Sequence, residues 1–115
     1  MKSESGRFSE LVPARNIKWE TGEDGRIFLL KEKSGNKLMK RLIGRFGKSQ
    51  FFRIHLDEIG SMVWDKIDGK NTVREIGEYL REEKGEAVVP QAVARVETFI
   101  AIMLKNRFIK FPERK

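Results

Sequence analysis

Residues 72–83 read TVREIGEYLREE, a helix start signal followed by three turns of an amphipathic helix. Thr72 and Glu75 form a capping box, in which the Thr oxygen and the Glu carboxylate each accept a backbone N–H that the helix leaves exposed. Lys84 and Gly85 mark the end of this helix. Apolar residues recur on one face at helical spacing and are expected to be buried: Val73, Ile76 and Leu80.

Two further helices are predicted on either side of this stretch. Asp57 is a good N-cap for the first of them, which ends at Asp68-Gly69. Pro90 suits the first turn of the second, which runs to about Asn106. The expected core stripe of this last helix is Val93, Val96, Ile100 and Leu104.

The residues before Asp57 contain alternating apolar and polar positions, the pattern of half-buried strands. Strands are predicted over residues 16–20, 26–31 and 51–56, and Asp24-Gly25 predicts a hairpin turn between the first two. A short terminal strand is expected over 107–111. This order predicts an α+β, winged-helix-like fold, with a small three-stranded antiparallel sheet packed on a three-helix bundle.

The predicted domain organisation is simple. Residues 1–14 are expected to form a flexible N-terminal segment, and residues 15–115 a single domain. Within it, residues 32–50 form a basic insertion. Leucines and a phenylalanine four apart allow a short helix there, and Gly44 and Gly47 weaken that assignment.

Positive charge is concentrated in one segment. From Lys31 to Arg53 there are eight basic residues and one acidic residue, which together account for the formal net charge of +7. Such a segment suits an acidic partner or a polyanion, and a solvated loop is the alternative. The residues proposed to form a partner-binding basic patch are Lys37, Lys40, Arg41 and Arg45.

Residues that could carry catalysis are missing. The chain has no cysteine and one histidine, His55, so a zinc site of Cys or paired His cannot form in one chain. No nucleotide-binding glycine motif is present. We expect no enzymatic activity, no metal and no cofactor. Neither a secretory signal nor an apolar run long enough for a membrane span is visible, so a cytoplasmic protein is expected.

Three stretches in order resemble the PqqD family, named after coenzyme PQQ synthesis protein D. They are LDEIGSMVWDKIDG at 56–69, TVREIGEYLREE at 72–83 and RVETFIAIMLKNRFIKF at 95–111. The resemblance implies a winged-helix-like recognition domain for ribosomally synthesised peptides. Such domains bind the leader of a precursor peptide and present it to a modifying enzyme, often a radical SAM enzyme. The basic insertion departs from short members of the family and favours a peptide other than the PQQ precursor.

In the family, the leader adds as a strand beside the third strand and packs on the third helix. Carried onto this sequence, the resemblance implies that the strand contributes Phe51, Phe52, Arg53, Ile54 and His55, and the helix Ala92, Arg95, Phe99, Ile102 and Asn106. The apolar arc of residues 90–106 is wider than one core stripe, which indicates either a second contact or cover by the hairpin. An open strand edge beside an apolar helix is the geometry of β-augmentation.

Two other functions remain open. A winged-helix domain of this charge can bind nucleic acid through its basic insertion, although the last helix exposes Ala94, Thr98 and Ala101 where a base-reading helix carries polar side chains. Alternatively, an unpaired third-strand edge can pair with a second copy, giving a homodimer.

Overall fold

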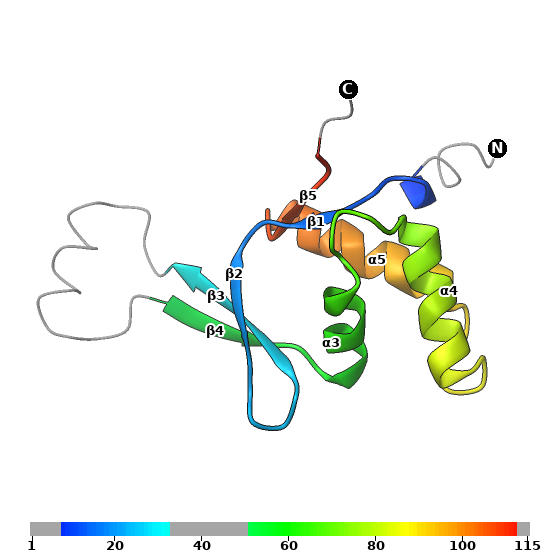
Figure 1. Cartoon of the computed structure of the whole chain (residues 1–115), viewed down its shortest axis with the longest axis horizontal. Coiled ribbons are helices and arrows are strands. Elements are labelled where there is room, and N and C mark those ends of the chain that lie inside the picture. Colours follow the sequence, from blue (N-terminus) through cyan, green and yellow to red (C-terminus); the bar gives the residue numbers. More distant parts are fainter. Residues whose placement is uncertain (1–7, 33–50, 113–115) are drawn as a thin grey trace, which may run out of the picture. The chain divides into compact units, whose positions relative to one another are not determined.

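The computed structural model describes residues 8–32 and 51–112 (Figure 1). The chain divides into two compact units. We call residues 17–57 the sheet unit, and residues 1–16 together with 58–115 the helical unit. The prediction of one domain over 15–115 stays a prediction, and the helix considered within 32–50 lies outside the described residues.

The sheet unit is a three-stranded antiparallel sheet in the order β2-β3-β4. Its strands are β2 (Lys18–Thr21), β3 (Ile27–Glu32) and β4 (Phe51–His55). The predicted hairpin turn is confirmed: the Gly22 N–H donates to the Arg26 carbonyl at 2.8 Å, and Gly25 has a φ of 84°. That φ lies in the left-handed region, which a glycine adopts without steric cost.

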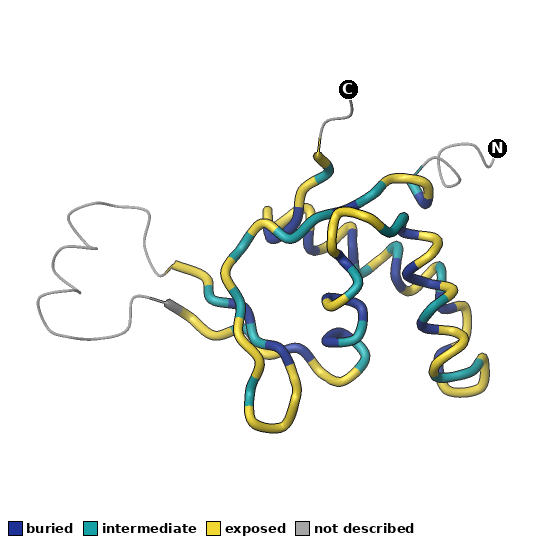
Figure 2. The backbone as a smooth tube through the Cα atoms, viewed as in Figure 1, coloured by how far each residue is buried: buried dark blue, intermediate teal, exposed yellow. Residues whose placement is uncertain are grey.

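The two faces of this sheet differ in burial, and buried and half-buried residues alternate along the first part of β3 (Figure 2). Residues directly opposite each other on neighbouring strands share a face, so the register assigns each side chain to one side. One face carries the buried residues Ile27, Leu29 and Leu56. The other face carries Phe28, which is half-buried, and the exposed Arg53 and His55 near it. We call this second face the polar face.

The helical unit contains α3 (Glu58–Asp65), α4 (Val73–Lys84) and α5 (Ala92–Lys105). The predicted capping box is confirmed: Thr72 Oγ1 accepts the Glu75 N–H at 3.0 Å, and Glu75 Oε1 accepts the Thr72 N–H at 2.8 Å. Among the described residues of this unit, these helices supply most of the buried apolar side chains: Val63, Trp64, Val73, Ile76, Leu80, Ala92, Val96, Ile100 and Met103. Ile67, just after α3, is also buried.

Helices α4 and α5 pack with their backbones close together at Gly77. A Cβ atom on Gly77 would lie 2.6 Å from the Val93 Cα and 2.8 Å from its Cγ2. Atoms in folded proteins do not approach so closely, so the helix crossing needs a residue without a side chain at position 77. Val93, predicted to be a core residue, is half-buried against this glycine.

The N-terminal segment is held on the helical unit from residue 8 onwards. The carbonyl of Leu11 accepts the Val73 N–H, and the carbonyl of Pro13 accepts the Gly69 N–H, both at 3.0 Å. Strand β1 (Ala14–Arg15) pairs with β5 (Ile109–Lys110), which forms a two-stranded sheet. The flexible segment over residues 1–14 stays a prediction, although backbone hydrogen bonds and strand pairing engage Leu11, Pro13 and Ala14 of it.

Asp68 organises the turn between α3 and α4. Its Oδ1 accepts the backbone N–H groups of Lys70 at 2.9 Å and Asn71 at 3.2 Å. Partial desolvation alone would raise the pKa of Asp68, but these hydrogen bonds to the ionised form outweigh it and lower the pKa below its ordinary value. The carboxylate thus stabilises the turn that follows α3, a helix that ends at Asp65 and not, as predicted, at Asp68-Gly69.

Two details of α5 differ from the prediction. The helix begins at Ala92, after Gln91 in a left-handed conformation with a φ of 56°, so Pro90 precedes the helix instead of lying in its first turn. Leu104 is 37% exposed, whereas Met103 is buried, so Leu104 was wrongly placed in the core stripe. The difference of one position arises because apolar residues lie around much of this helix.

The α+β class and the three-stranded antiparallel sheet are confirmed, and the described residues contain the three predicted helices. The terminal strand pairs with β1 in a sheet of its own. The winged-helix-like arrangement, in which the sheet packs on the helices, stays a prediction.

We expect Gly77→Ala to lower the free energy of unfolding by roughly 1 to 2 kcal/mol. Alanine is the better helix former by about 1 kcal/mol, so a net loss would mean that the clash with Val93 outweighs the gain in propensity. Urea denaturation of both proteins measures the difference. The control is Glu78→Ala, an exposed change in the same helix, which should stay within about 0.5 kcal/mol. A stabilised Gly77→Ala variant would show that the close packing is not a constraint.

Candidate functional site

Strand β4 lies at one edge of the three-stranded sheet. It pairs with β3 along one side, from Phe28 opposite His55 to Glu32 opposite Phe51. Among the described strands, none pairs with its other side. We call this side the β4 edge. An edge strand of five residues offers a backbone template for another extended chain.

The hydrogen-bond pattern identifies which residues face the β4 edge. The Leu56 N–H donates to the Ile27 carbonyl at 2.9 Å. Because bonded and non-bonded pairs alternate along an antiparallel ladder, Ile54 also bonds to β3, whereas the backbone groups of Arg53 and His55 point outward. An added strand would therefore form its hydrogen bonds with Arg53 and His55.

The side chains beside this edge alternate in chemistry. Phe52 and Ile54 lie on the face with the buried residues, and Phe52 is 53% exposed. Arg53 and His55 lie on the polar face beside Phe28. The Arg53 guanidinium carbon is 5.4 Å from the centre of the Phe28 ring, and the His55 ring centre is also 5.4 Å from it. Phe28 thus supports both polar side chains of the edge.

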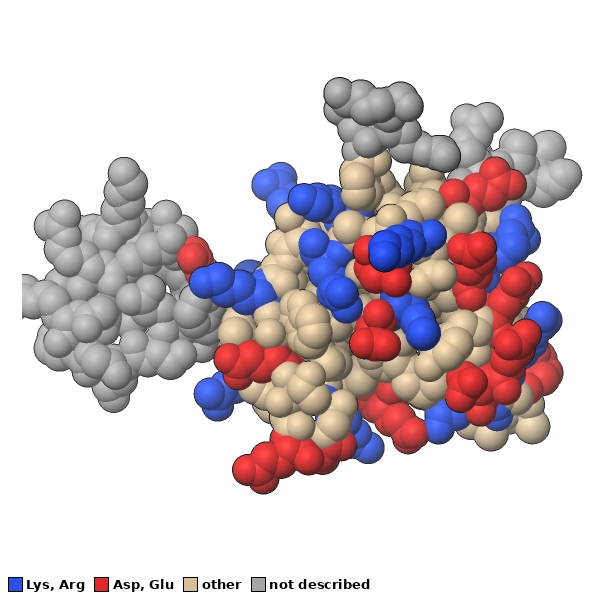
Figure 3. Space-filling view, viewed as in Figure 1, with Lys and Arg blue, Asp and Glu red and all other residues tan. Residues whose placement is uncertain are grey.

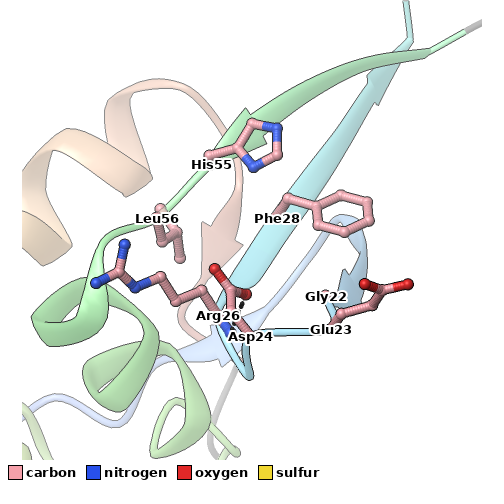
Figure 4. Close-up of a pocket in the computed structure, with 7 residues that line it drawn as sticks. All are labelled: Gly22, Glu23, Asp24, Arg26, Phe28, His55 and Leu56. Atoms are coloured by element: carbon pink, nitrogen blue, oxygen red, sulfur yellow. Dashed lines mark hydrogen bonds between the residues drawn. The ribbon is translucent and has the colours of Figure 1, made fainter.

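A hollow of about 440 Å³ lies where β4 ends near the β2–β3 turn (Figure 4). Phe28, His55 and Leu56 form its strand side, and the turn forms the rest. The Arg26 N–H donates to Asp24 Oδ1 at 3.0 Å, so one carboxylate of the hollow is engaged in the turn itself. Its lining residues are Gly22, Glu23, Asp24, Arg26, Phe28, His55 and Leu56.

The α5 residues predicted to bind peptide have different surroundings. Ala92 is 2% exposed, so its side chain belongs to the core and it is not available for peptide. Ile102 is 51% exposed and Phe99 is half-buried. Arg95 donates through Nε to the Pro90 carbonyl at 2.9 Å, and Asn106 donates through Nδ2 to the Ile102 carbonyl at 2.8 Å. We call Arg95, Phe99, Ile102 and Asn106 the α5 flank.

The remaining expectations concern the basic patch, metal binding and a membrane span. The basic patch of Lys37, Lys40, Arg41 and Arg45 is outside the described residues. Over 8–32 and 51–112, no group of three or more His, Cys, Asp or Glu side chains could hold a metal ion. In the same ranges, no helix is long and apolar enough to cross a membrane.

Sequence reasoning missed Phe28 as a residue of the site. Its position in a strand that is apolar on both faces made it resemble an ordinary core residue. The register shows otherwise, since Phe28 lies directly opposite His55 and next to Arg53. Pairing register depends on the turn and the partner strand, so a single strand's sequence does not reveal it.

Comparison with known proteins identifies one family. The family model for coenzyme PQQ synthesis protein D (PqqD) matches residues 48–109, more than half of the chain. The match includes β4, α3, α4, α5 and the start of β5. Neither a curated protein nor a solved structure matches the chain. The chain therefore belongs to the PqqD family.

Proposed function

We propose that this protein is a peptide-binding accessory protein. It binds the leader of a ribosomally synthesised precursor by strand addition at the β4 edge and presents it to a modifying enzyme, of the radical SAM class. The observation that carries the proposal is the outward direction of the Arg53 and His55 backbone groups on an edge strand. Strand addition uses main-chain hydrogen bonds for affinity and side-chain pockets for specificity.

Membership of the PqqD family supports this role. The family is a non-catalytic accessory family, and membership implies an interaction with a precursor peptide and a PqqE-like enzyme. In this proposal the leader, and not a small molecule, is the ligand of the β4 edge. The basic insertion favours a precursor other than that of PQQ, as the sequence indicates.

The α5 flank is the second proposed peptide-contacting surface, on the helical unit. Ile102 is 51% exposed, and Phe99, one helical turn before it, is half-buried. An apolar side chain of a bound peptide would bury this surface and gain about 25 cal/mol for each Å² removed from water. The proposal for this surface rests on its apolar exposure and on the family resemblance.

A role as a reader of DNA bases receives less support. The exposed face of α5 carries Ala94, Thr98 and Ala101, and the Thr98 hydroxyl already donates to the Ala94 carbonyl at 3.2 Å. Acidic side chains gather over α4 in Figure 3, where Glu75, Glu78, Glu82 and Glu83 are exposed. Such a surface repels the phosphate backbone, so nucleic-acid binding would fall to the basic insertion and would be non-specific.

Proline substitution tests strand addition at the β4 edge. We expect His55→Pro to weaken peptide binding at least tenfold, because it removes one outward N–H and places a ring against the incoming strand. Thr21→Pro is the matched control, since the register also points the Thr21 N–H outward, but from the β2 edge. Peptides selected from a random library on the full chain serve as probes, measured by fluorescence anisotropy.

His55→Ala removes the side chain but keeps the backbone N–H, so this variant should retain most of the peptide binding. Ile54→Pro, which removes an inward N–H, should disrupt the sheet and so marks the outcome of a misfolded variant. If His55→Pro folds and binds as well as wild type, strand addition at this edge is refuted.

Glutamate substitution tests the α5 flank. Ile102→Glu should leave the fold intact, because Ile102 is already 51% exposed, and should weaken peptide binding roughly tenfold. Ile100→Glu is the contrasting change: Ile100 is 0% exposed, so an unpaired charge there should unfold the helical unit. Circular dichroism and anisotropy with the same peptides separate the two effects. Unchanged binding by folded Ile102→Glu would remove this surface from the proposal.

Charge reversal tests the basic patch as a docking surface for an acidic partner. Changing Lys37, Lys40, Arg41 and Arg45 to Glu should leave the melting temperature nearly unchanged, because exposed charges contribute little to stability. The same change should slow association with poly-glutamate, more at low salt than at high salt. Random duplex DNA is the second probe. Tight, salt-sensitive duplex binding by a wild type that binds no peptide would favour the nucleic-acid function instead.

A further inference from the structure

Arg53 combines three properties at one point of the β4 edge. Its backbone N–H and carbonyl point outward, its side chain is exposed on the polar face, and its guanidinium lies over the Phe28 ring at 5.4 Å. Within residues 8–32 and 51–112, it has no ion pair with a carboxylate. The positive charge is therefore held in place without being neutralised there.

A cation–π contact with an aromatic ring restrains a guanidinium and leaves its donors available. The ring attracts the positive charge, and the contact uses none of the five N–H donors. A planar fork of this kind matches a carboxylate, which can accept two parallel hydrogen bonds. Phe28 thus prepares Arg53 to receive an acidic group.

The geometry of strand addition brings one side chain of the ligand to this fork. The peptide residue paired directly with Arg53 has its side chain on the same face, with Cβ atoms about 4.5–5.5 Å apart. Its two neighbours in the peptide project to the other face, where Phe52 and Ile54 lie. Successive side chains of a bound peptide therefore lie in turn on the polar face, beside Arg53, and on the opposite face, beside Phe52 and Ile54.

Other charges on the polar face limit where an acidic side chain fits. Glu23 and Asp24 lie with His55 around the hollow at the turn end of the sheet, and Glu20 lies opposite Phe28. A carboxylate paired with His55 would approach these acids, whereas one paired with Arg53 lies two pairs further from the turn. Lys18 and Arg53 both lie opposite Leu30, so that row of the sheet is basic.

We propose that Arg53, positioned by Phe28, reads a carboxylate in the bound peptide. The recognised segment has Asp or Glu at the position paired with Arg53 and apolar residues immediately before and after it. This inference rests on the proposed strand addition and specifies the class of peptide that the β4 edge accepts. Arg53 is then the specificity-determining residue of the edge, and Phe28 is its positioning residue.

Selection from a random peptide library tests the inference with full-length wild type, Arg53→Gln and Arg53→Glu. Wild type should enrich peptides with one acidic residue between two apolar residues. Selection on Arg53→Glu should instead enrich peptides with Lys or Arg at that position, and selection on Arg53→Gln should show no preference for an acidic residue there. In one wild-type-selected peptide, Glu→Gln or Asp→Asn should weaken binding to wild type roughly three- to fivefold and leave binding to Arg53→Gln unchanged.

A further variant tests Phe28. Phe28→Leu keeps apolar volume but removes the ring, so it should reduce the same three- to fivefold discrimination while the peptide still binds. Circular dichroism checks that each variant is folded. We expect each to fold, because Arg53 is exposed and Phe28 is half-buried. Equal discrimination in Phe28→Leu would show that the ring does not position Arg53.

The outcomes separate this inference from the proposed function. Peptides that require the His55 N–H for binding but show no acidic preference, or one that Arg53→Glu does not change, would overturn the carboxylate inference and leave strand addition standing. Failure of wild type to select any peptide that His55→Pro weakens would overturn strand addition, and the inference with it.

Discussion

The close packing of α4 on α5 at Gly77 is the constraint on which the helical unit depends. Because the Val93 Cα and Cγ2 lie so near, no side chain fits at position 77 between the two helices. This packing fixes the rotation of α5 about its own axis. Val96 and Ile100 consequently face the core, and Ile102 faces outward. A small residue in α4 thereby helps to decide which part of α5 is exposed.

In the sheet unit, the register of β3 against β4 has the same importance. A shift of one residue would exchange the two faces and would also exchange the inward and outward backbone groups of β4. The Gly22–Arg26 turn and the Leu56–Ile27 hydrogen bond fix the positions of the strands on either side of β3. One register therefore determines both the residues that an added strand would bond and the side chains that it would lie beside.

The sequence predicted the elements that depend on local chemistry. The capping box of Thr72 and Glu75 and the Asp24-Gly25 turn need only neighbouring residues, and both are confirmed. It did not predict features that depend on distant pairing. The carbonyls of Pro13 and Leu11 accept the N–H groups of Gly69 and Val73, and β1 pairs with β5 almost a hundred residues later in the chain. The role of Phe28 likewise requires the cross-strand register.

Ala92 shows how a family resemblance and a structure answer different questions. The resemblance points to one side of a helix, but a fully buried alanine on that side contributes packing and no contact surface. The α5 flank is therefore narrower than the sequence suggests, and it is centred on Phe99 and Ile102.

An open sheet edge exposes a protein to pairing with its own copies as well as with a ligand. Charge on the edge can distinguish the two. If two β4 strands paired antiparallel about Arg53, the two guanidinium groups would lie directly opposite each other, and like charges in that position destabilise a strand pair. A peptide with a carboxylate at the same position would gain from the charge that a second copy would find repulsive. Arg53 is therefore suited both to accepting an acidic peptide and to disfavouring self-association at the edge. Specificity here needs repulsion from the wrong partner as well as attraction to the right one.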